Sequence, residues 1–210
     1  MYNKNKIFVI GFNKSGTSSI AKFFAQCNIP TIHNDSGKIA ETMRSNMRTG
    51  EKLLTGYPDY TVYADIENVI HATEQDKEPF FGYEHFDKLY KQYPESKFIL
   101  NYRDINDWLL SRCRHGLNEA FFSGQRKSYL NQFVKYYDTD VYSIIQMWQE
   151  HYHTHIKNVR TFFSKPGRES RLLELDMDVS NDKLTNHLHE FFTDMDLPNQ
   201  VKLPTVHKTR

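Results

Sequence analysis

The clearest chemical pattern in the chain lies at residues 11–18, which read Gly-Phe-Asn-Lys-Ser-Gly-Thr-Ser. An apolar run at 6–10 precedes this segment and helix-forming residues follow it, so the pattern predicts a strand, a phosphate-binding loop and a helix. Glycines allow the backbone to approach an anion, and a helix N-terminus adds amide donors and partial positive charge. A glycine pair alone would favour an ordinary turn with a surface lysine. The complete pattern between strand and helix favours an anion site.

The position of the lysine in this segment narrows the choice of ligand. The nucleotide-binding consensus places lysine directly after the second glycine, where this chain has Thr17, and the only lysine of the loop is Lys14. Hydrolysis of a magnesium nucleotide normally needs the consensus lysine on the terminal phosphates and the next hydroxyl on the metal. The loop therefore predicts a phosphate-bearing donor other than ATP.

A second cation follows another apolar run, at residues 97–102. Arg103 comes directly after this run, and Ser111 lies eight residues further on. Eight residues are a little over two helical turns, so Ser111 would face the same sheet edge as Arg103. An arginine there could bind a second phosphate in a bidentate manner. Taken alone, an ordinary salt bridge for Arg103 and a surface position for Ser111 would be favoured.

Two residues are candidates for a general base. Asp65 closes the apolar segment 61–65, and a partly desolvated carboxylate there could have a pKa high enough to accept a hydroxyl proton. A helix N-cap is an equally weighted role for this aspartate. His33 follows the short segment 30–33 and is the rival base, because the reference pKa of histidine is near neutral. His115 and His155 are weaker candidates.

The remaining histidines and the cysteines do not predict a metal or redox site. His151, His153 and His155 alternate along an expected helix, and this spacing splits the helix face, which favours surface or packing roles over zinc. Cys27 and Cys113 lie in expected helices without metal or redox spacing. They are interpreted as buried thiols in a reducing compartment.

The elements that must position these groups alternate along the chain. Strands are expected at 6–10, 30–33, 61–65, 97–102 and 171–176, and helices at 17–26, 38–49, 84–93, 105–115, 140–163 and 182–194, with 116–137 unassigned. Alternating strands and helices predict an α/β fold with a mostly parallel sheet covered on both faces. Ligands of such sheets bind at the carboxyl ends of the strands, where the candidate residues fall.

Length and composition restrict the number of domains, the kinds of partner and the location of the protein. The 210 residues suit a single domain, 1–210, and 27 basic residues against 26 acidic ones create no global field that would attract nucleic acid or an anionic membrane. The apolar runs are far shorter than the roughly 20 residues of a membrane span, and the N-terminal run is too short for a signal peptide. The expectation is a cytoplasmic protein whose anion affinity is local.

Together, in this order, the two motifs resemble those of the sulfotransferase family, whose members use 3′-phosphoadenosine 5′-phosphosulfate (PAPS). The family's first motif, Lys-Ser/Thr-Gly-Thr-Thr/Ser after the first strand, is similar to residues 14–18. Its second motif, a strand running into arginine with serine eight residues later, is similar to residues 98–103 and Ser111. Similarity to bacterial members extends over most of the chain, through residues 93–100, Trp108, the Tyr152, His155, Val159 and Phe162 spacing, and residues 172–176.

The resemblance implies a P-loop NTPase-like three-layer sandwich and metal-independent transfer of a sulfuryl group from PAPS to a hydroxyl or amine of a small-molecule or saccharide acceptor. Lys14 would stabilise the charge on the leaving oxygen. Asp65, in the region where Golgi-type relatives keep a catalytic glutamate, or His33 would take the acceptor proton. Acceptor selection is expected in residues 34–60 and 116–140. The implied ligands of the 5′-phosphosulfate are Lys14, Ser15, Gly16, Thr17 and Ser18, and those of the 3′-phosphate are Arg103 and Ser111.

Departures from the family pattern leave alternatives open. Ile105 replaces the proline common after Arg-Asp, and residues 203–210 lack the Arg-Lys-Gly phosphate loop of the cytosolic eukaryotic branch. The Thr-His-Leu-Pro segment that carries the base in that branch is also absent. The base and any third ligand of the 3′-phosphate therefore stay open. The alternatives are a P-loop small-molecule kinase or NTPase with Asp104 as metal ligand, which the displaced lysine disfavours, and a non-catalytic nucleotide-binding module.

Overall fold

A five-stranded parallel sheet forms the centre of the protein, which the computed structural model describes over residues 5–69, 78–116 and 128–205. The strands lie in the order β2-β3-β1-β6-β7, and every neighbouring pair is parallel. The predicted parallel sheet is confirmed, although several strands are shorter than their apolar runs. The strands are β1 (Ile7–Val9), β2 (Thr31–His33), β3 (Val62–Ala64), β6 (Lys97–Tyr102) and β7 (Leu172–Asp176).

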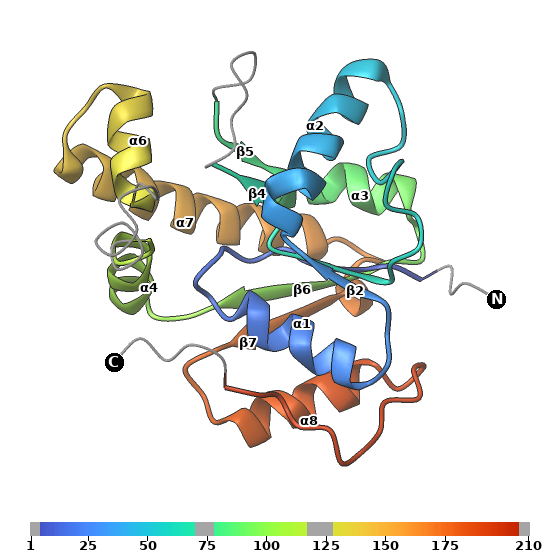
Figure 1. The fold of residues 1–210 in the computed structure, drawn as a ribbon. Helices are drawn as coiled ribbons and strands as arrows, with labels where there is room; N and C mark the ends of the chain where they lie inside the picture. Colours follow the sequence, from blue (N-terminus) through green and yellow to red (C-terminus); the bar gives the residue numbers. More distant parts are fainter. Residues whose placement is uncertain (1–4, 70–77, 117–127, 206–210) are drawn as a thin grey trace.

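Helices cover both faces of the sheet and give three layers (Figure 1). Successive residues of β1 point to opposite faces, as the pleat requires. Ile7 and Val9 belong to the core under the first group of helices, whereas Phe8 and Ile10 belong to the core under the second group. The first group is α1 (Thr17–Gln26) and α8 (Asn181–Phe191); the second includes α2 (Lys38–Thr49), α3 (Phe86–Gln92) and α7 (Val141–Phe163).

Several helices begin at polar N-cap residues whose side chains bind the amides of the first turn. Asp104 caps α4 (Ile105–Cys113), accepting hydrogen bonds from the amides of the first turn. Ser128 caps α6 (Tyr129–Tyr137) and Asp140 caps α7 in the same way. The helices α4 and α8 end earlier than predicted, at Cys113 and Phe191, because helix ends are set by capping and packing that local sequence only partly encodes.

A short antiparallel hairpin beside the sheet was not predicted. Its strands are β4 (Glu67–Asn68) and β5 (Phe80–Phe81), with Glu67 opposite Phe81. The helix expected from residue 84 begins as a 3₁₀ helix, η2 (Gly82–His85), and continues as α3. Two further 3₁₀ helices are η1 (Asp35–Gly37) and η3 (Glu169–Arg171). Of the unassigned region 116–137, residues 117–127 lie outside the described residues, as do residues 206–210 of the C-terminal segment.

Candidate active site

One large cavity lies along the carboxyl ends of the parallel strands. Its volume is about 1190 Å³, and residues at or just after the end of all five strands line it. All nine residues predicted from sequence are among its lining residues. They are Lys14, Ser15, Gly16, Thr17 and Ser18 after β1, His33 at the end of β2, Asp65 after β3, and Arg103 with Ser111 after β6.

The loop after β1 is tied at both ends to the neighbouring strand β6. The side-chain oxygen of Asn101 accepts a hydrogen bond from Gly11 N at 3.0 Å, and its nitrogen donates to Ser15 O at 2.7 Å. A side chain at Gly11 would collide with this strand, because an added Cβ would lie 2.0 Å from Asn101 O. Close approach to β6 therefore explains the first glycine of the motif.

The middle of the loop has the backbone shape of an anion site. Lys14 and Gly16 both have positive φ, at 63° and 85°, and Gly16 precedes α1 without making a side-chain cap. The first residues of α1, Thr17 and Ser18, line the cavity, and no capping side chain occupies their amides. Ser15 Oγ is buried and lacks a hydrogen-bond partner among the described residues. A buried hydroxyl in this state is suited to a ligand oxygen.

His33 lies directly beside this loop. Its Nε2 is 3.2 Å from both Thr17 Oγ1 and Ser18 Oγ, and 3.7 Å from Asp65 Oδ2. Burial lowers the pKa of His33 below its ordinary value, which keeps the ring neutral at pH 7. The two candidate bases are therefore neighbours within one site, and either can reach a group held near the loop.

Asp65 is largely buried, and its Oδ1 has no hydrogen-bond partner in the described structure. Burial raises the pKa of Asp65 to about 6, while Arg112 and Lys14 act in the opposite direction. The N-cap role considered for Asp65 is wrong, because the strand β4 follows it instead of a helix. Asp65 has a φ of 56°, and its carbonyl accepts hydrogen bonds from Glu67 N and Asn34 Nδ2, both at 3.0 Å.

Arg103 is held in the cavity by its main chain and by two acidic neighbours. The Tyr152 hydroxyl accepts a hydrogen bond from Arg103 N at 3.1 Å and donates one to Arg103 O at 2.6 Å. The guanidinium lies 3.6 Å from Asp107 and 3.7 Å from Asp178, and its Nε is buried without a hydrogen-bond partner among the described residues. Ordinary salt bridges are thus present, as the simpler interpretation expected, and a donor group remains for an anion. Ser111 is buried on the same wall.

Asp104 caps a helix, whereas the kinase alternative requires it as a metal ligand. Its Oδ1 accepts from Asn106 N at 2.9 Å and from Asp107 N at 3.1 Å. The carboxylate therefore caps α4, and it is not among the residues that line the cavity in the described part of the chain. This placement disfavours the metal-ligand role that a P-loop kinase would assign to it.

The wall formed by residues after β7 was missed by sequence reasoning. Met177–Asn181 line the cavity, and Met177 N donates to Tyr102 O at 2.8 Å. Asn181 Nδ2 donates to Leu203 O at 3.0 Å and to Thr205 Oγ1 at 2.7 Å, which brings the segment 203–205 to the rim. The rule that ligands bind after parallel strands could have indicated the first segment. The second depends on a contact between residues more than 20 positions apart.

Arg112 is a buried residue that binds the phosphate loop on the side of the protein interior, and sequence reasoning missed it as well. Its side chain is completely buried, and its Nη1 donates to Asn13 Oδ1 at 2.9 Å. The ring nitrogen of Trp108 donates to Asn13 O at 2.9 Å. The guanidinium lies over the rings of Trp108, Tyr129 and Trp148, with centroid distances of 4.9, 4.9 and 4.8 Å. Only its position next to Ser111 in the motif could have drawn attention to it.

His151, His155 and the two cysteines lie away from the cavity, whereas His115, a weaker candidate for the base, is among its lining residues. His151 pairs with Glu84, whereas His155 is buried and donates to Ile10 O at 2.7 Å. Burial lowers the pKa of His155 to about 4, and this contact turns it away from the cavity, so it is unsuited to the role of base. Cys27 is buried at the end of α1, but Cys113 is only half-buried, contrary to expectation. Burial raises the pKa of both thiols, which makes them poor nucleophiles.

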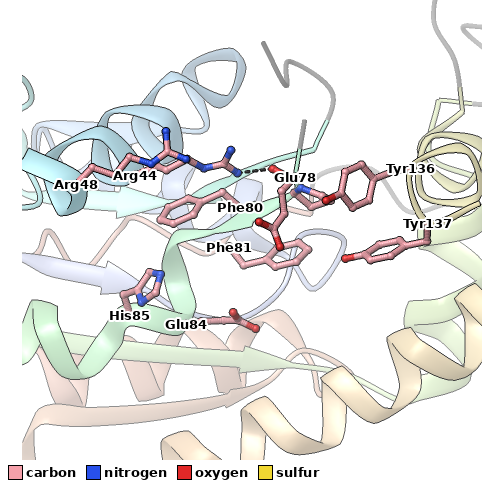
Figure 2. Close-up of a pocket in the computed structure, with 10 residues that line it drawn as sticks. Arg44, Arg48, Glu78, Phe80, Phe81, Glu84, His85, Tyr136 and Tyr137 are labelled. Atoms are coloured by element: carbon pink, nitrogen blue, oxygen red, sulfur yellow. Dashed lines mark hydrogen bonds between the residues drawn. The ribbon is translucent and has the colours of Figure 1, made fainter. Parts of the chain in front are cut away.

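A second, smaller cavity of about 600 Å³ lies between α2, β5 and α6 (Figure 2). Aromatic rings and charged groups share its lining. Arg44 lies over the Phe80 ring at 5.0 Å and donates to Glu78 O. The segments expected to select the acceptor, 34–60 and 116–140, both contribute, through Arg44 and Arg48 from the first and Tyr136 and Tyr137 from the second.

The comparisons with known proteins agree with this geometry. A family model described as "Sulfotransferase domain" matches residues 6–210, nearly the whole chain. The chain belongs to the sulfotransferase family. No curated protein sequence matches it significantly.

Among solved structures, this sulfotransferase is similar to the crystal structure of a sulfotransferase from Alicyclobacillus acidocaldarius. The TM-score is 0.53 at 13% identity, and the match covers 98% of this chain and 86% of the other. At this identity the likeness concerns the fold, which is an α/β sandwich of P-loop type. In the described part of this sulfotransferase, no helix has both the length and the apolar character needed to cross a membrane.

Proposed function

We propose that this sulfotransferase moves a sulfuryl group from PAPS to a hydroxyl or amine of a small-molecule or saccharide acceptor by in-line displacement. One observation carries the proposal. A single cavity gathers a phosphate-type loop, an arginine–serine pair at a separate strand end, and two adjacent candidate bases. These are the groups needed to hold a nucleotide with two separated phosphates and to remove a proton from an acceptor.

The residues present fit such a donor. The amides at the start of α1, the unpartnered Ser15 Oγ and Lys14 can receive a 5′-phosphosulfate. Arg103, whose Nε makes no hydrogen bond among the described residues, and Ser111 can receive a 3′-phosphate. The cavity volume of about 1190 Å³ is sufficient for a nucleotide together with part of an acceptor.

The chain's own groups then have separate tasks. The bound donor supplies the sulfuryl group, whose bond to the 5′-phosphate oxygen breaks as the acceptor oxygen bonds to sulfur. Lys14 and the Thr17 and Ser18 hydroxyls stabilise the negative charge that grows on the departing phosphate oxygen. Asp65 takes the acceptor proton, with His33 as the alternative. A pKa of about 6 leaves Asp65 ionised at pH 7 and still basic enough to accept a proton.

The first expected result concerns the choice of nucleotide. Calorimetry should show that 3′,5′-adenosine bisphosphate binds roughly tenfold or more tightly than ADP or ATP, because only the bisphosphate engages both anion sites. Magnesium should not strengthen its binding. Equal or tighter binding of ATP, increased by magnesium, would indicate a kinase or NTPase. Tight bisphosphate binding without turnover of PAPS on any acceptor would indicate a binding module.

The second expected result concerns the 3′-phosphate. Arg103→Ala should weaken bisphosphate binding by about 2–4 kcal/mol, and Ser111→Ala by less, because a charge-assisted bidentate contact is lost in the first case. Binding of ADP, which lacks the 3′-phosphate, should change little. Arg171→Ala, which removes a distant surface pair with Glu95, is the matched control. If Arg103→Ala weakens both nucleotides equally, the arginine has a structural role.

A further inference from the structure

Two acidic residues share one tight turn behind the cavity. Asp65 and Glu67 flank Ile66 directly after β3, and Glu67 N donates to Asp65 O at 3.0 Å. The side-chain nitrogen of Asn34 donates to the carbonyls of both acidic residues, at 3.0 and 3.1 Å. The turn therefore has a fixed backbone shape. It places Asp65 at the cavity wall and Glu67 in the interior, where Glu67 is 4% exposed.

Glu67 belongs to a buried chain of contacts that ends at the phosphate loop. The Tyr129 hydroxyl donates to Glu67 Oε1, and Arg112 Nη2 donates to the Tyr129 hydroxyl at 3.1 Å. The same guanidinium donates to Asn13 in the phosphate loop. Glu67 Oε2 and Arg112 Nε are buried and have no hydrogen-bond partner among the described residues. These hydrogen bonds connect β4, α6 and α4 to the phosphate loop, but they leave Glu67 Oε2 without a hydrogen-bond partner among the described residues.

The charges of this interior do not balance if both acids are ionised. Arg112 is the completely buried cation beside them, and it acts on both carboxyls. The other titratable groups that act on the pair are Lys14 from the loop, Tyr129 from α6 and His151 from α7, with Tyr83 from η2 close to Glu67. His33 from β2 lies 3.7 Å from Asp65. Two like charges in such a site favour one proton between them.

We propose that Asp65 and Glu67 act as one carboxyl pair, in which Glu67 keeps its proton to a higher pH than Asp65, so that Asp65 ionises first and is the charged member that faces the cavity. The proposal deepens the proposed function, on which it rests, because Glu67 acts through Asp65 and does not line the cavity. A proton on Glu67 Oε2 would also change the unsatisfied acceptor into a donor. Burial raises the pKa of Glu67 to about 7, above that of Asp65 at about 6, in agreement with this order.

The test is a pH titration of the full-length protein without donor, in which carbon-13 NMR monitors the Asp and Glu carboxyl groups. The wild type should show two coupled steps, near pH 6 and 7. Asp65→Asn removes a charge that raises the pKa of Glu67, so the Glu67 midpoint should fall by roughly one pH unit. Glu67→Gln keeps the acceptor for Tyr129; the step near 7 should vanish and the Asp65 step should stay near 6, because Glu67 is still neutral when Asp65 titrates. Tyr129→Phe removes a donor to the charged form of Glu67 and should raise the Glu67 midpoint. Glu95→Gln, at an exposed surface pair, is the control.

An activity profile completes the test. In the wild type, kcat should rise with pH as Asp65 loses its proton, and Glu67→Gln should keep this rise near pH 6, because the neutral amide reproduces protonated Glu67. An unchanged Glu67 midpoint in Asp65→Asn, or wild-type carboxyls that both titrate at ordinary values near 4, would overturn the pair. Coupled titration without any sulfuryl transfer would support the carboxyl pair and would instead overturn the proposed function. The two failures are therefore distinguishable.

Discussion

Lys14→Ala is expected to lower kcat by roughly 10²–10³, the scale seen when one preorganised charge donor is removed from a transition state. Charge moves onto the departing phosphate oxygen only as the sulfuryl group leaves, so the ammonium group matters most at that moment. Affinity for 3′,5′-adenosine bisphosphate should fall less, because the amides of α1 and Arg103 remain. Steady-state kinetics at saturating PAPS, paired with calorimetry, separates these two effects.

A lysine on the same helix provides the control for this variant. Lys22 is exposed on α1, so Lys22→Ala should leave both kcat and donor affinity unchanged. Should Lys14→Ala retain the wild-type kcat and only raise the KM for PAPS, Lys14 would be a ground-state binding group. The proposed charge stabilisation would then belong to other donors of the loop.

Asp65→Asn should lower kcat toward an ordinary alcohol by about 10²–10⁴, the usual contribution of a positioned general base. Donor affinity should be retained, because Asp65 is not one of the expected phosphate ligands. A base with a pKa of about 6 loses activity as the pH falls through 6, since the protonated form cannot accept a proton. A nitrophenol acceptor, whose hydroxyl is already acidic, should recover much of the lost rate in Asp65→Asn but not in Lys14→Ala.

His33→Ala decides between the two adjacent candidates for the base. Loss of activity in His33→Ala together with wild-type activity in Asp65→Asn would show that His33 is the base. Asp182→Asn, at an exposed pair with Lys202, controls for the general effect of removing a carboxylate. If both site variants lose activity on alcohols but only one recovers with the nitrophenol, the one that recovers carries the base.

The fold could be predicted from sequence wherever an apolar run was long or was followed by a clear helix signal. The strand, loop and helix at residues 6–26 and the long helix α7 are of this kind. The hairpin of β4 and β5 could not be predicted, because each strand has only two residues and the pairing joins positions more than ten residues apart. Pairing at that separation leaves no local pattern.

The site also has features that local sequence predicts and features that depend on contacts between distant residues. The part of the lining that follows β1, β2, β3 and β6 could be predicted, because parallel strands place the residues after them at one edge of the sheet, which needs no knowledge of contacts. The surroundings of those residues could not. Asp is a common N-cap residue, which makes that role plausible for Asp65 from sequence, but its backbone carbonyl is bound by Asn34, 31 positions earlier. Arg112 depends on Asn13 and Tyr129, which belong to two other elements.

The double hydrogen bond of Asn101 to the two ends of the phosphate loop bears on the thermodynamics of donor binding. One side-chain amide, on the inner strand β6, hydrogen-bonds to both Gly11 and Ser15 when the protein folds. The loss of conformational entropy in this loop therefore belongs to folding and is not repeated when a ligand arrives. Donor binding should accordingly carry a small entropic penalty from the loop, and its selectivity should come from a rigid arrangement of donors.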